Sequence, residues 1–176
     1  YGVTPAAVAA LAMRYYMERY GVSRDEMSEW PVMMHGNALE NPYAQIRKRI
    51  SREEVAASQV IADPITMMDS SPIGDGAAAI LVASEEAVRG RADPDNLVEV
   101  AAAVAVSDFL TYSLKEEPDR IPAARLAAEK AYLMARIEPR EIDVVELHDE
   151  YTVTGVVLLE ELGFSERGRG AKDVAE

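Results

Sequence analysis

Hydrophobic and polar positions along the chain switch between helical and strand-like spacing, with turn residues between the segments. The clearest helical pattern runs from Pro5 to Tyr20, where a threonine precedes the first turn and a glycine follows the last. This spacing predicts one amphipathic helix whose apolar side faces a core. The predicted face consists of Val8, Leu11, Ala12, Tyr15 and the stem of Arg19.

Capping signals and apolar faces predict five further helices. Ser23 and Ser51 each open a capping box, in which a glutamate follows the serine by three positions. Pro31 lies inside the first of these patterns and should kink or split that helix, because proline interrupts the helical hydrogen bonds. The other three helices are expected at 84–89, 122–136 and 151–162.

Three apolar runs show no helical spacing and are predicted to be strands, at 77–83, 97–106 and 142–147. The first is continuously apolar, which is typical of a strand covered on both faces. Residues 90–96 are polar and contain a proline, so they form the best internal boundary. Strands that alternate with helices predict an α/β layered sheet.

Composition narrows the functional classes. The chain has 176 residues, 49% of them hydrophobic and 28% charged, with a net charge of −13 and no cysteine. The acidic balance argues against sequence-independent nucleic-acid binding. The lack of cysteine excludes disulfides, thiolate metal sites and a cysteine nucleophile within this chain. Neither a membrane-spanning run nor a signal peptide is visible, so we expect a cytoplasmic location.

The most informative chemistry lies at 143–151. There His148 should stand where a buried strand ends and a helix begins, an edge at which ligands bind in α/β sheets. A neutral imidazole could donate to a developing oxyanion; alternatively, His148 caps a helix or braces a loop. Asp149 and Glu150 could act in proton transfer, or as a helix cap and a solvated side chain. Tyr151 could donate a proton or belong to the core.

Two further segments could bind a ligand. Ser70 and Ser71 begin a small-residue loop with glycines, which lets a ligand approach the backbone but also suits a tight strand entrance. Arg47 and Lys48 belong to a basic cluster completed by positions 49 and 52. The cluster could hold a phosphate or form a solvated face balanced by nearby glutamates. His35, among methionines, is expected to be structural, and no metal site is predicted.

Together these segments resemble the thiolase superfamily, in its sterol-carrier-protein type with archaeal and bacterial acetyl-CoA acetyltransferase-like members. The likeness spans nearly all of the chain in family order. His148 occupies a position that is asparagine in most thiolases and histidine in this subgroup, whereas Tyr151 replaces the usual phenylalanine. The matching motifs are Asp75 to Ala79 after the serines, 143–151, 160–164, 41–45 and 168–171.

The resemblance implies a partial thiolase-like layered fold. Residues 1–90 would be the loop domain plus the end of the N-terminal half, and 97–176 the first part of the C-terminal half. The chain starts at Tyr1 and would be the centre of a longer enzyme. The nucleophilic cysteine of that family lies upstream, and its Gly-His-Pro histidine and second cysteine lie downstream. The chain alone is therefore expected to be inactive.

The implied activity is an acyl-CoA acyltransferase of the acetyl-CoA C-acetyltransferase type in lipid metabolism, acting by Claisen condensation or thiolysis. His148 would stabilise the thioester enolate, and Ser71, with Ser70 beside it, would contact the pantetheine arm. Arg47 and Lys48 would be near the CoA phosphates. CoA thioester would be a substrate rather than a tightly bound cofactor. A homodimer and an OB-fold partner protein are expected.

Two other functions stay open within the resemblance. A thiolase-fold retro-aldolase acting on CoA-linked side chains would use the hydroxyl of Tyr151 for proton transfer. A non-catalytic subunit would bind CoA esters or scaffold a partner. The presence or absence of catalytic cysteines in the parent protein distinguishes these functions.

Overall fold

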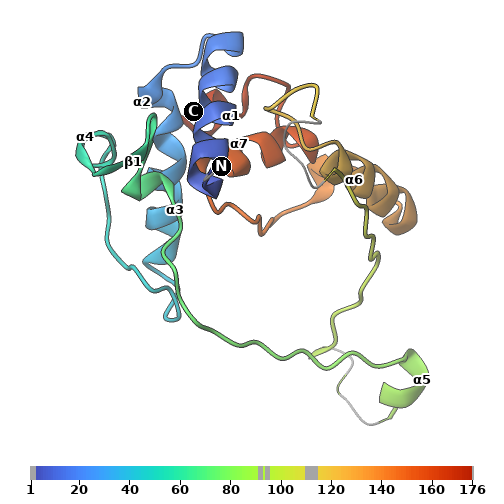
Figure 1. The fold of residues 1–176 in the computed structure, drawn as a ribbon. Coiled ribbons are helices and arrows are strands. Elements are labelled where there is room, and N and C mark those ends of the chain that lie inside the picture. The colour runs from blue at the N-terminus through green and yellow to red at the C-terminus, as the bar shows by residue number, and fades with distance from the viewer. Residues whose placement is uncertain (1–2, 91–92, 94–95, 110–114, 176) are drawn as a thin grey trace.

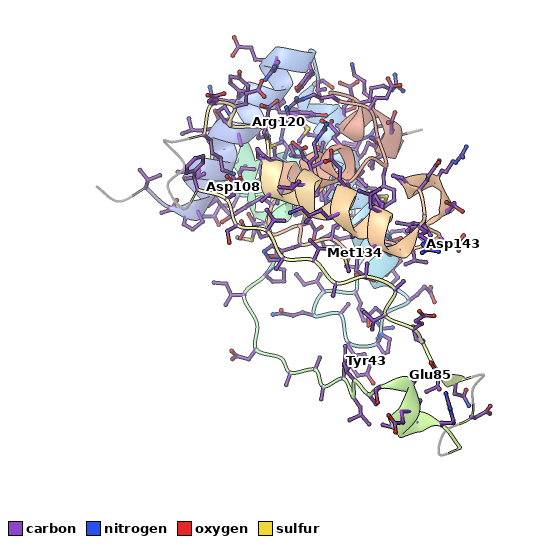
Figure 2. All side chains as sticks on the ribbon, turned by 90° about the vertical axis from the view of Figure 1, so that its right-hand side faces the viewer. Tyr43, Glu85, Asp108, Arg120, Met134 and Asp143 are labelled. Carbon is purple, nitrogen blue, oxygen red and sulfur yellow. The ribbon has the colours of Figure 1, made fainter. Side chains whose placement is uncertain are left out.

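A helical body and one long extended excursion make up the described chain, which covers residues 3–90, 93, 96–109 and 115–175 of a computed structural model. Figure 1 shows the excursion leaving the body in green and returning in yellow-green, with helix α5 (Glu85–Val88) at its far end. In Figure 2, Glu85 lies well away from Arg120, which belongs to the body. The body therefore holds the packed core, and the excursion stands outside it.

Helix α1 (Pro5–Tyr20) forms as predicted. The Thr4 hydroxyl accepts a hydrogen bond from the Ala7 N–H at 3.2 Å, and Gly21 ends the helix at a φ of +62°, which favours glycine. The predicted buried face is wrong in part, because Leu11 is 58% exposed whereas Tyr16 is fully buried. On the face of α1 next to the predicted one, small side chains let the helix pack closely against the core. That buried face contains Ala6, Ala9, Ala10, Ala12, Met13 and Tyr16.

The second helical pattern is split, as expected, but not at the proline. Helices α2 (Arg24–Met27) and α3 (Glu29–Ala38) meet at Ser28, and Pro31 lies in the first turn of α3. Proline is tolerated there because the first N–H groups of a helix have no intrahelical acceptor. Helix α4 (Arg52–Ala57) follows its capping serine as predicted.

A small hairpin and a 3-10 turn follow α4. Strands β1 (Val60–Ala62) and β2 (Ile65–Thr66) pair antiparallel, and η1 (Met67–Asp69) continues from β2. We expected irregular backbone from Asp63 onward, because these strands are too short to give an alternating pattern. The hairpin contacts α1 and carries the chain toward the serine pair at positions 70 and 71.

The prediction of three buried strands is wrong for the described chain. The runs at 77–83, 97–106 and 142–147 form no strand, and β1 and β2 are the named strands among the described residues. Leu81 is 95% exposed, Val98 93% and Val144 78%. A buried strand needs hydrogen-bonding neighbours and covering layers, and the described residues bring neither to these runs. The layered α/β sheet is therefore replaced here by a mostly helical body with a small sheet.

The C-terminal part supplies the remaining helices. Helix α6 (Pro122–Ala135) forms as predicted, but its apolar face is largely open, with Met134 58% exposed near the C-terminal end of the helix (Figure 2). The turn η4 (Pro139–Glu141) and helix α7 (Thr152–Glu161) follow. The last helix, α8 (Gly170–Ala175), was not predicted.

Helix α7 lies at the centre of the body, against α1, α3, α6 and α8. Val153, Val156 and Val157 fill the core from this helix. Its last turn carries two buried carboxylates. Glu160 accepts hydrogen bonds from the Tyr16 hydroxyl and the Gly170 N–H, and Glu161 accepts from two arginines that precede or belong to α6. Both ends of the chain thus share one core. Among the described residues, no helix is long and apolar enough to cross a membrane.

Candidate functional site

The serine loop and the histidine segment meet in the folded chain. The Ser71 N–H donates to the Glu150 carbonyl oxygen at 3.0 Å, and Ser70 forms an isolated antiparallel bridge with Tyr151. These contacts join segments that lie about eighty positions apart in the sequence. His148 is exposed and lies two residues before Glu150. The structure therefore brings Ser70, Ser71 and the 148–151 segment, all predicted from the sequence, to one place.

Asp69 stabilises the contact between the serine loop and the 148–151 segment. Its side chain is fully buried, and its Oδ1 accepts a hydrogen bond from the Thr152 hydroxyl at 2.9 Å. Its Oδ2 accepts from the Thr66 N–H at 2.9 Å and from the Thr66 hydroxyl at 2.8 Å, and it also pairs with Arg24. Because Thr152 is the first residue of α7, Asp69 ties the serine loop directly to the start of that helix.

Trp30 fastens the same segment from α3. Its indole Nε1 donates to Asp149 Oδ2 at 2.9 Å, across 119 positions of sequence. The ring is 3% exposed and lies against Gly155, where an added Cβ would stand 2.2 Å from Trp30 Cζ2. A side chain at position 155 would therefore push the indole away from Asp149.

A cavity of about 560 Å³ opens beside these contacts. Its wall is largely apolar, with polar groups where the serine loop and the start of α7 meet it. The size lies within the usual range of small-molecule sites. The polar lining residues include Lys48, Ser70, Ser71, Asp149 and Thr152. His148 and Tyr151 are not among the residues that line this cavity.

The basic cluster is largely engaged with neighbouring groups. Lys48 Nζ lies 2.7 Å from Glu54 Oε1, and this hydrogen bond lowers the pKa of Glu54. Arg47 Nη2 donates to the Leu39 carbonyl oxygen at 3.2 Å, and Arg52 pairs with Asp25. Of Arg47 and Lys48, only Lys48 lines the cavity, so the two predicted residues do not converge on one point there.

Two neighbouring features complete the description. Burial, with the charge of Glu150 adding to it, raises the pKa of Tyr151 above its ordinary 10.0. His35 Nδ1 lies 3.1 Å from the Lys48 carbonyl oxygen, a backbone contact of the structural kind expected for it. No group of metal-ligating side chains occurs among the described residues.

Sequence reasoning missed the residues that hold the site together. Asp69 directly precedes the serine pair and Trp30 directly precedes Pro31, but the sequence indicates a partner for neither. Their partners, Thr152 and Asp149, lie 83 and 119 positions away. Nothing in local periodicity or capping signals such long-range pairs, so only the folded chain identifies them.

Comparison with known proteins gives a consistent result. A family model described as thiolase C-terminal domain-like matches residues 105–176. Acetyl-CoA acetyltransferase of Methanocaldococcus jannaschii is 38% identical over 174 residues, which are 99% of this chain and 44% of that protein. Sterol carrier protein 2 of Oryctolagus cuniculus is 33% identical over 179 residues, covering 97% of this chain and 32% of that protein.

The chain belongs to the thiolase superfamily. It is of the type that resembles sterol carrier protein 2 and the archaeal acetyl-CoA acetyltransferases, as its motifs indicated. A solved structure named Ltp2-ChsH2(DUF35) aldolase superposes with a TM-score of 0.88 at 28% identity, covering 98% of this chain and 46% of that one. This thiolase-superfamily chain thus spans less than half the length of these relatives.

The structural likeness accounts for the extended runs of this thiolase-superfamily chain. Because the superposition covers 98% of the chain, it extends over most of 77–83, 97–106 and 142–147. Their extended path is therefore shared with a longer thiolase-fold protein, although the part of the chain that the structure describes gives them no strand partners. The thiolase-like fold is confirmed for this part of the architecture.

Proposed function

We propose that this chain provides the CoA-facing loop and the oxyanion histidine of a thiolase-type acyl-CoA acyltransferase, which carries out Claisen condensation or thiolysis of CoA thioesters. The observation that carries the proposal is the direct backbone contact between Ser71 and Glu150, beside the Ser70–Tyr151 bridge. This contact joins the serine that would contact pantetheine to the segment that bears His148. A thioester bound along the serine loop would thus lie beside the segment that bears the histidine.

Each residue would have a limited task. Ser71, and Ser70 beside it, would hydrogen-bond the amides of the pantetheine arm. His148 would donate a hydrogen bond to the enolate oxygen that forms when the acetyl thioester loses its α-proton, and it would stabilise that charge. Lys48 would face a CoA phosphate from the cavity wall, and Arg47 would do so from outside it. The substrate is a CoA thioester, as elsewhere in the thiolase family.

The fold assignment is part of the same proposal. Residues 1–90 would be the loop domain with the end of the N-terminal half, and 97–176 would begin the C-terminal half. The runs at 77–83, 97–106 and 142–147 would then become strands of layered sheets completed by other parts of a longer enzyme. Their apolar, outward-facing side chains support this assignment, because such runs are stable only when covered.

The test replaces His148 in the longer enzyme that contains this chain. His148→Ala should lower the turnover of acetyl transfer by about 10²–10³-fold, the usual effect of removing one oxyanion donor. His148→Asn is the matched control, because asparagine retains a side-chain N–H donor, and it should keep more activity. An alanine variant with unchanged turnover would refute the role. The 176-residue chain alone should show no acetyl transfer, since it has no cysteine.

A second candidate function is a thiolase-fold aldolase acting on CoA-linked side chains. Two observations favour it: Tyr151 adds a hydroxyl where the family usually has phenylalanine, and the superposed solved structure is named an aldolase. In this case the Tyr151 hydroxyl would donate its proton to the aldol oxygen as the carbon–carbon bond forms, and in retro-aldol cleavage its phenolate form would accept the proton from that oxygen as the bond breaks. Tyr151→Phe should then abolish retro-aldol cleavage, whereas an acyltransferase should lose little activity.

The partners belong to the proposal as well. The name of the superposed structure joins Ltp2 to ChsH2, a DUF35 protein. By analogy, this chain's parent would associate with an OB-fold protein of the DUF35 kind, and the resemblance to thiolases implies that it would also form a homodimer. Co-purification of the parent protein with such a protein encoded nearby would support the assembly, and a parent that remains alone at working concentration would count against it.

A further inference from the structure

The position of His148 depends on neighbouring residues rather than on contacts of its own. Among the described residues, its imidazole makes no hydrogen bond or ion pair, and the run before it at 142–147 is extended without strand pairing. The nearby residues that hydrogen bonds hold in place all follow His148 in the sequence. Asp149 is held by Trp30, Glu150 by the Ser71 N–H, and Thr152 by Asp69.

Trp30 makes the contact that is adjacent to the histidine in sequence. The indole has a single donor, and it is directed to Asp149 Oδ2 at 2.9 Å. The ring is 3% exposed, so an unpaired N–H there would be unfavourable and the contact persists. Rotation of the Asp149 side chain is restricted by this hydrogen bond, and the backbone next to His148 is restricted with it.

Gly155 of helix α7 lies directly against the indole ring. An added Cβ at this position would lie within 2.2 to 2.8 Å of three indole atoms, so the ring sits directly on the backbone of α7. Glycine weakens a helix interior, yet α7 carries one where the ring packs. The indole is thus held between α3, to which it belongs, and the first turns of α7, with its N–H directed to Asp149.

We propose that Trp30 is a positioning residue for His148: the indole, seated on Gly155, holds Asp149 and thereby sets the place of the neighbouring imidazole. The inference rests on the proposed function for its catalytic consequence. Trp30 itself would touch no reacting atom. Through this contact, helix α3 near the start of the chain determines where a histidine near its end presents its donor.

The first test measures catalysis in the longer enzyme that contains this chain. Trp30→Phe keeps an aromatic ring but removes the donor, and it should lower kcat by about 10–10²-fold with little change in KM, because small misplacements of a reacting group are costly. Tyr132→Phe is the matched control. It removes one aromatic hydrogen bond, from Tyr132 to the Leu162 carbonyl oxygen at the other end of α7, and kcat should be unchanged.

Substitutions of Asp149 test the same hydrogen bond from its acceptor side. Asp149→Ala should lower kcat as much as Trp30→Phe, whereas Asp149→Asn keeps an oxygen acceptor for the indole and should retain most of the turnover. The Trp30→Phe/Asp149→Ala double variant should be no worse than either single variant, because both break one contact. Additive losses in the double variant, or a Trp30→Phe enzyme equal to the Tyr132→Phe control, would overturn the inference.

The second test uses the 176-residue chain and is independent of activity. The ring-proton NMR signal of His148 should shift or broaden in Trp30→Phe and not in Tyr132→Phe. An unchanged signal would overturn the positioning role even if the enzyme lost activity. Conversely, if His148→Ala has full turnover while the NMR signal responds to Trp30→Phe, the proposed function fails and the structural coupling stands.

Discussion

Replacement of Asp69 gives the sharpest test of how the serine loop is joined to α7. The carboxylate is fully buried and accepts four hydrogen bonds, from the Thr66 N–H, the Thr66 and Thr152 hydroxyls and the Arg24 guanidinium. Asp69→Ala leaves these donors without an acceptor. Removing one partner of a buried ion pair costs about 3–5 kcal/mol. Because the Arg24 side chain is 24% exposed and can turn toward water, we expect the lower half of that range.

Asp69→Asn separates charge from shape. With its oxygen at the Oδ2 position, asparagine keeps the Thr66 contacts, and its amide can donate to the Thr152 hydroxyl, which then acts as acceptor. Only the charge opposite Arg24 is lost. The difference between a charged and a neutral hydrogen bond is about 1–2 kcal/mol, so this variant should lie between the native chain and Asp69→Ala.

The assay is urea unfolding of the 176-residue chain followed by far-UV circular dichroism, which reports the helical body. Asp25→Ala is the matched control, because the Asp25 carboxylate also pairs with an arginine but is 67% exposed. Such a surface pair contributes about 0–1 kcal/mol. If Asp69→Ala and Asp25→Ala lower the free energy of unfolding equally, the buried network does not hold the loop to α7, and the reasoning is refuted.

Two further predictions concern stability. Burial alone would raise the pKa of Glu161, but hydrogen bonds from Arg120 and Arg125 hold this pKa below its ordinary 4.5. The stability that the Glu161 carboxylate contributes is therefore present above pH 4.5 and is lost as the pH falls through the lower pKa of the folded state. Glu161→Gln should therefore cost about 1–3 kcal/mol at neutral pH in urea unfolding and show a flatter loss of stability in acid; parallel acid limbs would contradict this. Ser51→Ala removes the cap of α4, whose Val55 is fully buried, and should cost about 1 kcal/mol. The same change at Ser84, the cap of the outlying α5, should leave the midpoint of global unfolding unchanged, and equal losses at both serines would show that burial of α4 is irrelevant.

Local chemistry made the helices predictable. The caps at Thr4, Ser23, Ser51 and Ser84 form as expected, because a serine or threonine oxygen satisfies N–H groups within its own helix. The same locality explains the errors. The break between α2 and α3 is at Ser28 rather than at Pro31, because proline is compatible with a first turn. Periodicity alone could not choose between adjacent faces of α1.

Strand prediction failed for a reason of another kind. The run at 77–83 has the composition of a buried strand, yet Ile80 is 87% exposed. A helix satisfies its backbone within one segment, whereas a strand requires partners from elsewhere. An apolar composition therefore indicates that a run is suited to burial, but it does not show which strands pair with it. The described chain places no pairing strand beside this run.

In the candidate site, too, the sequence indicated some features and only the folded chain showed the others. The sequence by itself predicted which residues would carry chemistry, namely His148, Tyr151 and the serines at 70 and 71, and it indicated the thiolase superfamily to which the chain belongs. Only the tertiary structure decided that these segments meet, and that Trp30 and Asp69 hold them. The physical reason is distance along the chain: an indole and a carboxylate 119 positions apart form a hydrogen bond only after α3 and α7 have packed together.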